Sequence, residues 1–336
     1  MPTPYSAVTA ADADADAQRI RFSFELFPPR NAEVAARMPL IVDELANLGP
    51  EFLSVTYGAG GSSQDMSLDL LRHIRDHTAV MPLAHLTCVG SSFSEAGALV
   101  REFRRNGIYD FLALRGDPPK GMSEDDDFLG DLRTGAEMVQ LVRHVEEQEQ
   151  IELASVKSPD DERWLVRERR RSTVCVAAYP NGHPSSRSMQ EDYDALLAKE
   201  AAGADLAFTQ LFFHAEDYFR FVEGAKKAGV TIPIIPGLLA VTSTARLERM
   251  AQLAGEEIPV GLYRSLDRAK SVRTRREIGI AHVTAMALDL IDGGAPGIHL
   301  YTQNRVDEPT EILARMDAVP RSLIRSEAER SATLSA

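Results

Sequence analysis

Polar residues that can carry chemistry recur within or directly after short apolar segments. Glu25 lies within one such segment and His85 within another, Arg115 and Asp117 directly follow a third, and Gln210 ends a later one. Carboxyl, imidazole and guanidinium groups transfer protons or bind charged ligands. Burying such groups together costs several kcal/mol unless they satisfy one another or a ligand. Their recurrence therefore predicts one shared binding site.

The apolar segments alternate with longer stretches of helical periodicity, which predicts parallel strands joined by helical crossovers. The predicted strands cover eight segments: 22–27, 52–56, 82–87, 109–114, 173–178, 206–210, 232–236 and 297–301. The predicted helices between them include 34–48, 66–77, 94–106, 189–202, 215–228 and 275–293. Eight repeats favour an α/β protein of the (β/α)8 TIM-barrel class over an open sheet, and no G-x-G-x-x-G or P-loop motif supports the open sheet.

Two segments interrupt this alternation. After the fourth strand, residues 124–171 carry an acidic run, a helical stretch and a basic cluster, which we interpret as a solvated excursion. After the seventh strand, 244–254 and 259–270 predict two extra helical segments. We expect an N-terminal tail over 1–19, the barrel over 20–310, and a C-terminal helical segment and tail over 311–336.

Composition excludes several classes of protein. A net charge of −13 argues against a general nucleic-acid binder. No apolar run approaches the roughly 18 residues that a membrane span needs, and the N-terminus lacks the pattern of a signal peptide. Cys88 and Cys175 lie in apolar runs, where buried reduced thiols are expected. These features predict a cytoplasmic protein, and the sequence predicts no metal site.

In a TIM barrel the chemistry lies at the C-terminal ends of the strands. A single Glu or His there is weak evidence, because a buried polar residue is often merely satisfied by hydrogen bonds. In this sequence seven of the eight predicted strands place polar residues in or just after their C-terminal halves. This concentration is difficult to explain by packing alone.

Eight sequence segments resemble, in chain order, the signature segments of methylenetetrahydrofolate reductases. They are 24–29 (FELFPP), 54–62 (SVTYGAGGS), 85–88 (HLTC), 114–117 (LRGD), 178–184 (AYPNGHP), 209–213 (TQLFF), 234–237 (IIPG) and 301–305 (YTQNR). The resemblance spans about residues 22–305 and is to the short bacterial type, which consists of the catalytic barrel. It implies reduction of 5,10-methylenetetrahydrofolate to 5-methyltetrahydrofolate with NADH or NADPH as electron donor.

The resemblance also assigns roles to residues. Glu25 matches the general acid that opens the folate ring to a 5-iminium ion, and its apolar flanks favour a carboxyl that keeps its proton. Gln210 matches the residue that binds the pterin, and Asp117 is assigned to catalysis and substrate binding. Arg305 suits the benzoyl-glutamate end because a guanidinium pairs with carboxylates. Tyr301 is expected to line the same wall.

Members of this family hold FAD. The matched positions, which could serve either a flavin or a nicotinamide, are Thr56, His85, Arg115, Gly116, Asp117, Tyr179, His183, Asp192 and Lys199. The outer half of that site departs from the family pattern at Thr134, Ser185, Ala195 and Ala198. Losing an aromatic platform and polar contacts there costs about 1–3 kcal/mol for each group. We therefore expect NAD(P)H to deliver hydride directly without a bound flavin, although FAD is the family norm.

Two other functions stay open at this point. One is a barrel flavin oxidoreductase that acts on another acceptor, and the other is a catalytically silent folate-binding protein. A buried acid at Glu25 argues against the silent protein, and the 209–213 match argues against a substrate other than folate. The sequence decides neither NADH against NADPH nor monomer against homo-oligomer.

Overall fold

The computed structural model describes residues 19–29, 31–56, 61–119, 121–123, 126–155 and 171–325. Its strands form one parallel sheet in the order β7-β6-β5-β4-β3-β2-β1-β9-β8. They are β1 (Phe22–Leu26), β2 (Phe52–Val55), β3 (Met81–Thr87), β4 (Asp110–Leu114), β5 (Val174–Ala178), β6 (Leu206–Thr209), β7 (Ile234–Ile235), β8 (Gly237–Leu238) and β9 (Ile298–Tyr301). The strand order follows the chain, as in a barrel.

Pro236 divides the seventh barrel strand into two short strands. Each of them pairs with a different neighbour, and together they close the sheet. β7 pairs with β6, whereas β8 pairs with β9, and only Pro236 separates β7 from β8. Proline has no N–H to donate to a neighbouring strand. Its carbonyl oxygen nevertheless accepts a bond of 2.9 Å from the backbone N–H of His299, which keeps the two edges joined. The TIM-barrel prediction is confirmed.

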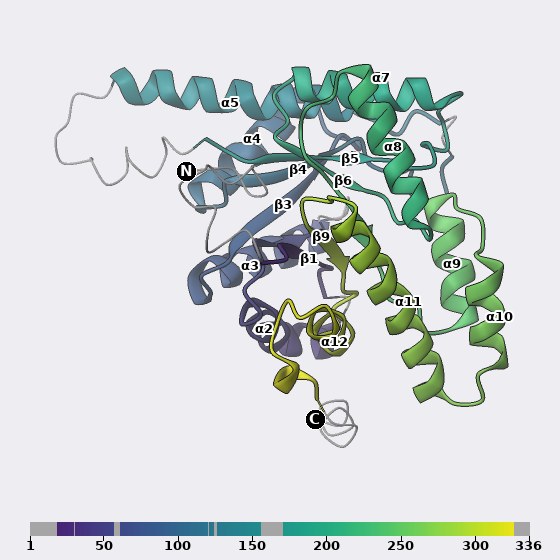
Figure 1. Ribbon diagram of the computed structural model, residues 1–336. Helices are drawn as coiled ribbons and strands as arrows, with labels where there is room; N and C mark the ends of the chain where they lie inside the picture. Colours follow the sequence, from purple (N-terminus) through teal and green to yellow (C-terminus); the bar gives the residue numbers. More distant parts are fainter. Residues whose placement is uncertain are drawn as a thin grey trace.

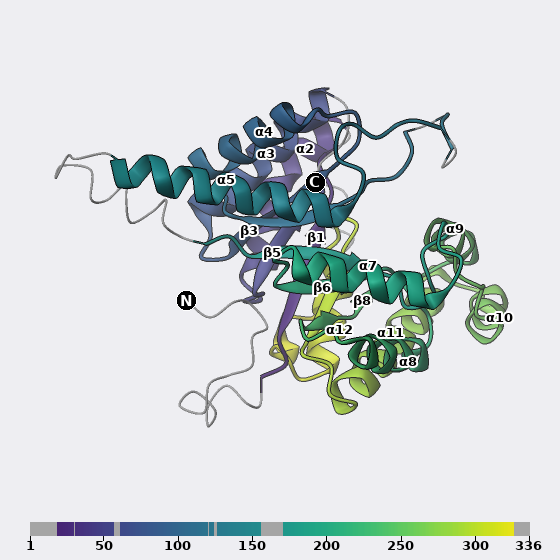
Figure 2. The same cartoon turned by 90° about the horizontal axis from the view of Figure 1, so that it is seen from above.

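Helices cover the outside of the sheet (Figures 1 and 2). They are α2 (Ala32–Ala46), α3 (Gly61–His77), α4 (Phe93–Arg105), α5 (Gly135–Ser155), α7 (Met189–Ala201), α8 (Ala215–Ala228), α9 (Thr244–Ala254), α10 (Val260–Arg268), α11 (Val272–Asp292) and α12 (Asp307–Arg315), followed by the 3-10 turn Arg321–Leu323. None of the helices in the described ranges has the length and apolar character that a membrane crossing requires.

Local sequence explains where several helices begin and which face they bury. Ser92 and Glu95 form a reciprocal capping box at the start of α4. The same helix buries Ala96, Val100 and Phe103, spaced by three or four residues, against the sheet. The two helices predicted after the seventh strand are present as α9 and α10.

The helical stretch predicted within 124–171 is α5, which connects β4 to β5. Met138, Val139, Leu141, Val142 and Val145 of this helix are buried in the main hydrophobic core. It therefore packs on the barrel as its neighbours do. Residues 156–170 of the predicted excursion, including most of its basic cluster, lie outside the described residues.

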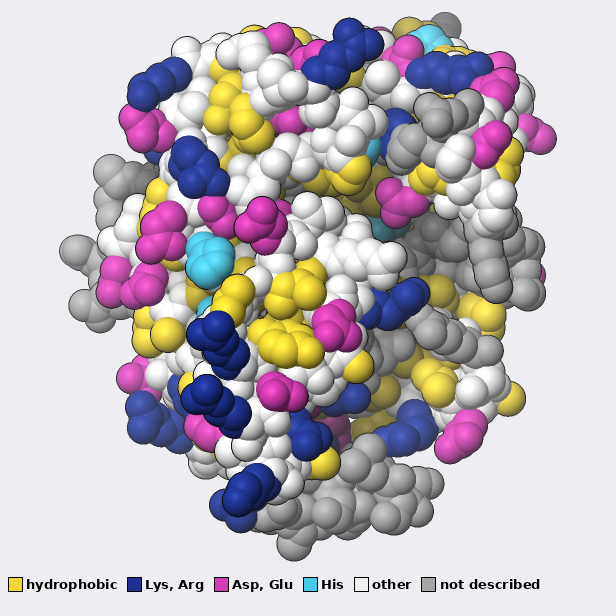
Figure 3. Space-filling model, turned by 90° about the vertical axis from the view of Figure 1, so that its right-hand side faces the viewer, with side chains coloured by type: hydrophobic (Ala, Val, Ile, Leu, Met, Phe, Trp, Pro, Cys, Tyr) yellow, Lys and Arg dark blue, Asp and Glu magenta, His cyan; other side chains and the backbone are white. Residues whose placement is uncertain are grey.

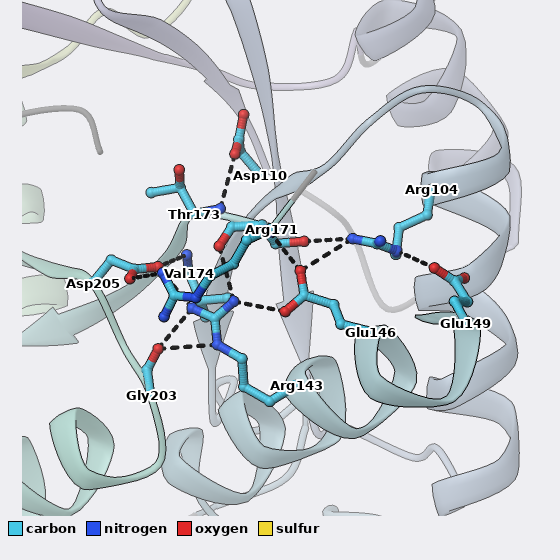
Figure 4. A network of polar contacts seen from close by, with 11 residues as sticks. Arg104, Asp110, Arg143, Glu146, Glu149, Arg171, Thr173, Val174, Gly203 and Asp205 are labelled. Carbon is cyan, nitrogen blue, oxygen red and sulfur yellow. Dashed lines mark hydrogen bonds and ion pairs between the residues drawn. The ribbon is translucent and has the colours of Figure 1, made fainter. Parts of the chain in front are cut away.

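A charged network closes the end of the barrel where β4, β5 and β6 begin (Figure 4). Glu146 on α5 accepts hydrogen bonds from Arg104 at 3.2 Å and from Arg143 at 2.8 Å. Arg143 also binds Asp205 at 2.7 Å, and Asp205 in turn accepts the backbone N–H of Val174 at 2.8 Å. Glu146 lies within the segment 124–171 that was interpreted as a solvated excursion, but it is only 4% exposed, so at this residue that interpretation was wrong. The guanidinium groups of Arg104, which is buried, and Arg143, which is partly buried, compensate its charge.

The barrel interior is apolar near the beginning of the strands and becomes polar towards their ends. A separate cluster fills the apolar part; it consists of Phe52, Leu83, Leu112, Cys175, Leu206, Phe208 and Ile235. On β1, Phe22, Phe24 and Leu26 belong to the core beneath the helices, so the alternate residues Ser23 and Glu25 lie on the interior face. The alternation of β1 thus directs a carboxyl group into the barrel.

Candidate active site at the C-terminal ends of the strands

A cavity of about 1310 Å³ opens at the C-terminal ends of the strands. The face seen in Figure 3 is hollowed, with hydrophobic side chains inside the hollow and Lys and Arg side chains close to it. The predicted site residues that line the cavity are Glu25, Thr56, His85, Arg115, Gly116, Asp117, Tyr179, His183, Asp192, Lys199, Gln210 and Tyr301. Residues 57–60 of the second signature segment lie outside the described residues.

Glu25 lies in the cavity between two histidine side chains. Its Oε2 atom is 3.6 Å from Nε2 of His85 and 4.0 Å from Nε2 of His299. Glu25 is 8% exposed, so few waters compete for these contacts. The arrangement places a carboxyl group, which can act as an acid or a base, beside two imidazole rings.

His299 was not among the predicted site residues, although it lies two positions before Tyr301 on the same face of β9. Its Nδ1 lies 2.8 Å from the hydroxyl oxygen of Ser23 on the neighbouring strand β1. The ring packs against Phe208 with a centroid distance of 4.4 Å and meets Tyr301 edge-on at 5.3 Å. When the Ser23 hydroxyl donates to Nδ1, the ring proton is on Nε2, the atom that faces Glu25.

His85 is neutral in this environment. Burial lowers its pKa to about 4, an effect that the Glu25 carboxyl opposes and His299 reinforces. Its Nε2 atom is buried and has no hydrogen-bond partner among the described residues. A neutral imidazole with an open ring nitrogen can bind a ligand by a hydrogen bond without adding charge.

Tyr301 joins the last strand to β6 above this group. Its hydroxyl donates to the carbonyl oxygen of Thr209 at 2.7 Å, and burial raises its pKa well above the usual value. Gly237 leaves the space that this contact needs, because a Cβ atom there would meet the Thr209 oxygen at 2.4 Å and the Tyr301 hydroxyl at 2.6 Å. The side-chain oxygen of Gln210 accepts a hydrogen bond of 2.8 Å from the backbone N–H of Leu211.

The loop after β9 is tied to the end of β1. Asn304 accepts the N–H of Phe27 at 2.8 Å and donates to its carbonyl oxygen at 2.9 Å. The adjacent Arg305 does not line the large cavity; it lies in a small neighbouring cavity and binds Glu308 at 3.0 Å. Asn304 therefore holds the two strand ends that carry Glu25 and Tyr301 in register.

Gly116 shapes the cavity wall after β4. It has φ of +88°, and a Cβ atom there would meet the side chain of Val89 at 2.6 Å. Glycine is therefore required at this turn. The neighbouring Arg115 guanidinium lies 5.6 Å from the ring centroid of Phe128, which orients it beside the cavity.

The outer part of the cavity, beside α5 and α7, contains polar groups that bind one another. Lys199 donates to the carbonyl oxygen of Ala177 at 2.8 Å, and burial lowers its pKa to about 8 while Asp192 opposes the shift. Asp192 Oδ1 accepts the N–H of His183 and the hydroxyl of Ser186, both at 3.1 Å. Asp192 Oδ2 is buried without a hydrogen-bond partner in the described part of the chain.

Carboxylates of the chain itself bind the backbone donors at the beginnings of these two helices. Glu137 accepts the N–H groups of Arg133 at 2.5 Å and Thr134 at 2.9 Å, before α5. Glu191 accepts the N–H of Arg187 at 2.8 Å, before α7. Helix beginnings commonly bind phosphates through the N–H groups of their first turn. Here the first turns of both helices carry negative charge, which opposes a phosphate.

Two further cavity residues were missed in the sequence. Arg246 and Arg249 lie one turn apart on α9 and both line the cavity. Their three-residue spacing on a predicted helix was the available signal. It could not indicate which face of the helix meets the cavity.

Sequence comparison identifies relatives along most of the chain. The sequence profile of methylenetetrahydrofolate reductase matches residues 10–317. The 5,10-methylenetetrahydrofolate reductase of Escherichia coli (strain K12) is 32% identical over 290 residues, covering 86% of this chain and 88% of that protein. Methylenetetrahydrofolate reductase (NADH) 1 of Arabidopsis thaliana is 30% identical over 313 residues, covering 90% of this chain and 49% of that protein.

Among solved structures, a Clostridium thermocellum protein described as binding two copies of 5-methyl-5,6,7,8-tetrahydrofolic acid has the same fold. It superposes with a TM-score of 0.57 at 15% identity, covering 92% of this chain and 98% of that one. The profile match and the bacterial relative decide the family. The chain belongs to the methylenetetrahydrofolate reductase family.

Proposed function

We propose that this protein reduces 5,10-methylenetetrahydrofolate to 5-methyltetrahydrofolate, with NADH or NADPH as the hydride donor and Glu25 as the general acid. The observation that carries the proposal is the Glu25 carboxyl, buried in the cavity within 4.0 Å of two imidazole rings. The relatives named for this reaction, one of which carries NADH in its name, support the substrate and a nicotinamide donor.

The chemistry assigns separate tasks to proton and hydride. Glu25 donates its proton to the leaving ring nitrogen of the folate, and the C–N bond breaks to form the 5-iminium ion. Hydride from the dihydronicotinamide then adds to the iminium carbon, so that the donor is oxidised by two electrons and the one-carbon unit is reduced. Glu25 regains a proton from solvent before the next turnover.

The cavity walls provide partners for the folate. Gln210 carries both a donor and an acceptor, which suits the edge of a pterin. Asp117 lies in the segment after β4 and lines the cavity. We assign it to contact with the pterin or with the redox ring of the cofactor. Tyr301 is fixed by its bond to Thr209 and supplies a rigid aromatic face beside Glu25.

The residues present fit the outer half of FAD poorly. Two helices whose beginnings could receive its diphosphate carry Glu137 and Glu191 in their first turns, and this negative charge opposes a phosphate. Ala195 lines this part of the cavity without a polar group. Thr56, His85 and Arg115, deeper in the cavity, suit a nicotinamide as well as a flavin. We propose that no flavin is retained and that hydride passes directly from NAD(P)H.

The size of the cavity is consistent with direct transfer. Pockets for one small ligand typically measure about 300–1,000 Å³, whereas this cavity measures about 1310 Å³. Folate and nicotinamide can therefore occupy it together, which direct transfer requires. A donor that leaves after each turnover also needs less affinity than a retained prosthetic group.

The test is a visible absorption spectrum of freshly purified protein, combined with an assay of NADH oxidation. We expect no flavin absorbance, and NADH oxidation only when methylenetetrahydrofolate is added. Stoichiometric FAD in the supernatant after denaturation would overturn the flavin-free route. A flavin-bound protein that ignores folate would indicate an oxidoreductase for another acceptor, and folate binding without turnover would indicate a silent binding protein.

A further inference from the structure

Helix α9 presents two positive charges to the cavity. It begins after the capping residue Ser243 and carries Arg246 and Arg249 on the side that lines the cavity. In Figure 1 this helix is the light green element at the right, beside α10. The two guanidinium groups are thus close enough along the helix to bind one extended anion.

Arg246, which is partly buried, lacks the compensation that buried arginines elsewhere in the fold receive, whereas Arg249 is exposed to solvent. Nε of Arg246 is buried and has no hydrogen-bond partner among the described residues. Burial and the nearby charge of Arg305 together lower the pKa of Arg246 to about 10, and Glu308 only partly opposes them. The carboxylate of Glu308 is already bound to Arg305 at 3.0 Å.

The contrast with the opposite end of the barrel shows what is missing. There Arg104 binds both Glu146 and Glu149, and Arg143 binds both Glu146 and Asp205. At the cavity, Arg246 and Arg249 make no ion pair with any carboxylate in the described ranges. A carboxylate from a ligand would supply the acceptor that Nε of Arg246 lacks and reduce the repulsion from Arg305.

The position of the two arginines points to the folate rather than to the nicotinamide donor. They lie in the first half of α9, which follows β8 and contacts the loop after β9 through Met250 and Gln303, whose Sδ and Nε2 atoms are 3.5 Å apart. This is the part of the barrel mouth that also contains Gln210 after β6. The residues assigned to the redox cofactor lie in or after β2 to β5, strands that are not neighbours of β8 in the sheet. Of these, the loop after β5 approaches the end of α9, where Asn181 donates to Glu256 at 2.7 Å.

We infer that Arg246 and Arg249 form a binding subsite for the carboxylates of the glutamate tail of the folate, an inference that rests on the proposed function. The α-carboxylate and γ-carboxylate of the first glutamate, or those of further γ-linked glutamates, pair with the two guanidinium forks. Arg305 then neutralises Glu308 and sets the position of Arg246, instead of holding the tail alone.

The experiment compares Arg246→Gln, Arg249→Gln and the double variant with wild type. Arg264→Gln is the matched control, because Arg264 is exposed on the neighbouring helix α10 and does not line the cavity. The measurements are the KM for methylenetetrahydrofolate with one and with four glutamates, the KM for NADH and for NADPH, and the melting temperature as a check of folding.

We expect each single variant to raise the KM for folate about tenfold, which corresponds to about 1.4 kcal/mol. The increase should be larger for the tetraglutamate than for the monoglutamate. The KM for NADH should change less than twofold, and the control should match wild type. An unchanged KM for folate in the folded double variant, or an increase confined to NADH or NADPH, would overturn the subsite.

A binding measurement separates this inference from the proposed function. Calorimetric titration with 5-methyltetrahydrofolate carrying one or four glutamates does not require turnover. If wild type fails to reduce methylenetetrahydrofolate, the proposed reaction is wrong, but a loss of tetraglutamate affinity in the double variant still supports the subsite. Equal affinity of wild type and double variant for both compounds would refute the subsite, whatever the enzymatic activity.

Discussion

Oε2 of Glu25 lies 3.6 Å from Nε2 of His85, and both side chains are almost fully buried. The two residues are on β1 and β3, with β2 between them, so their approach is made across the interior of the barrel. Since His85 is neutral near pH 7, it places no positive charge beside the Glu25 carboxyl. This relationship suits an acid that must release its proton to a substrate.

Replacing Glu25 with Gln should leave the fold and the affinity for folate in place, because the side chain keeps its shape. The proton donor is lost, so kcat should fall roughly 100- to 10,000-fold. Steady-state kinetics and a binding titration with 5-methyltetrahydrofolate measure the two effects separately. Turnover like that of wild type would remove Glu25 from the mechanism.

His85 should make the folded protein sensitive to acid. Its pKa is about 4 in the folded protein, below the ordinary value of 6.5 for an unfolded chain. Between these values the unfolded chain binds more protons, so the free energy of unfolding falls as the pH is lowered from 6.5 to 4. The 2.5-unit difference corresponds to about 3 kcal/mol.

Urea unfolding of wild type and His85→Asn across this pH range measures that contribution. The variant should lose less stability than wild type on acidification, since it has no imidazole to protonate. His144→Gln, a change at an exposed histidine on α5, is the control and should follow wild type. Parallel pH profiles for wild type and His85→Asn would contradict the prediction.

Gln210→Ala should weaken binding of the folate and spare the nicotinamide donor, because the Gln210 amide carries the donor and the acceptor that suit a pterin edge. Loss of hydrogen bonds to the pterin should raise the KM for folate roughly tenfold or more. Gln252→Ala on the exposed face of α9 is the matched control. An effect limited to the KM for NADH would mean that Gln210 binds the nicotinamide donor and not the folate.

Glu146→Ala should destabilise the protein by about 3 kcal/mol, because it leaves Arg104 and Arg143 buried with fewer acceptors. Kinetic constants should stay near wild type, since the network lies at the opposite end of the barrel from the cavity. The exposed neighbour Glu147, changed to Ala, provides the control for removing a carboxylate from the same helix. Equal urea midpoints for the two variants would refute a structural role for the Glu146 network.

The sequence by itself determined the order of the strands and most of the residues at the cavity. Alternation of residues along β1 places Glu25 on the opposite face from Phe24 and Leu26, and this is a local property that two-residue periodicity encodes. Regular strand and helix repeats predict a parallel barrel, and in a barrel the strand ends converge. For this reason Gln210 and Asp117 could be assigned to one site before any contact was known.

Only the tertiary structure decided which side chains meet. Ser23 and His299 are 276 positions apart, and they come within 2.8 Å because β9 pairs with β1 when the barrel closes. Arg246 lines the cavity because α9 lies at the barrel mouth. Its Nε has no acceptor among the described residues, and the carboxylate of Glu308 is bound to Arg305 instead. Periodicity is local, whereas the contact of Ser23 with His299 depends on the pairing of β1 with β9 and the place of Arg246 depends on the packing of α9, so no sequence pattern could predict them.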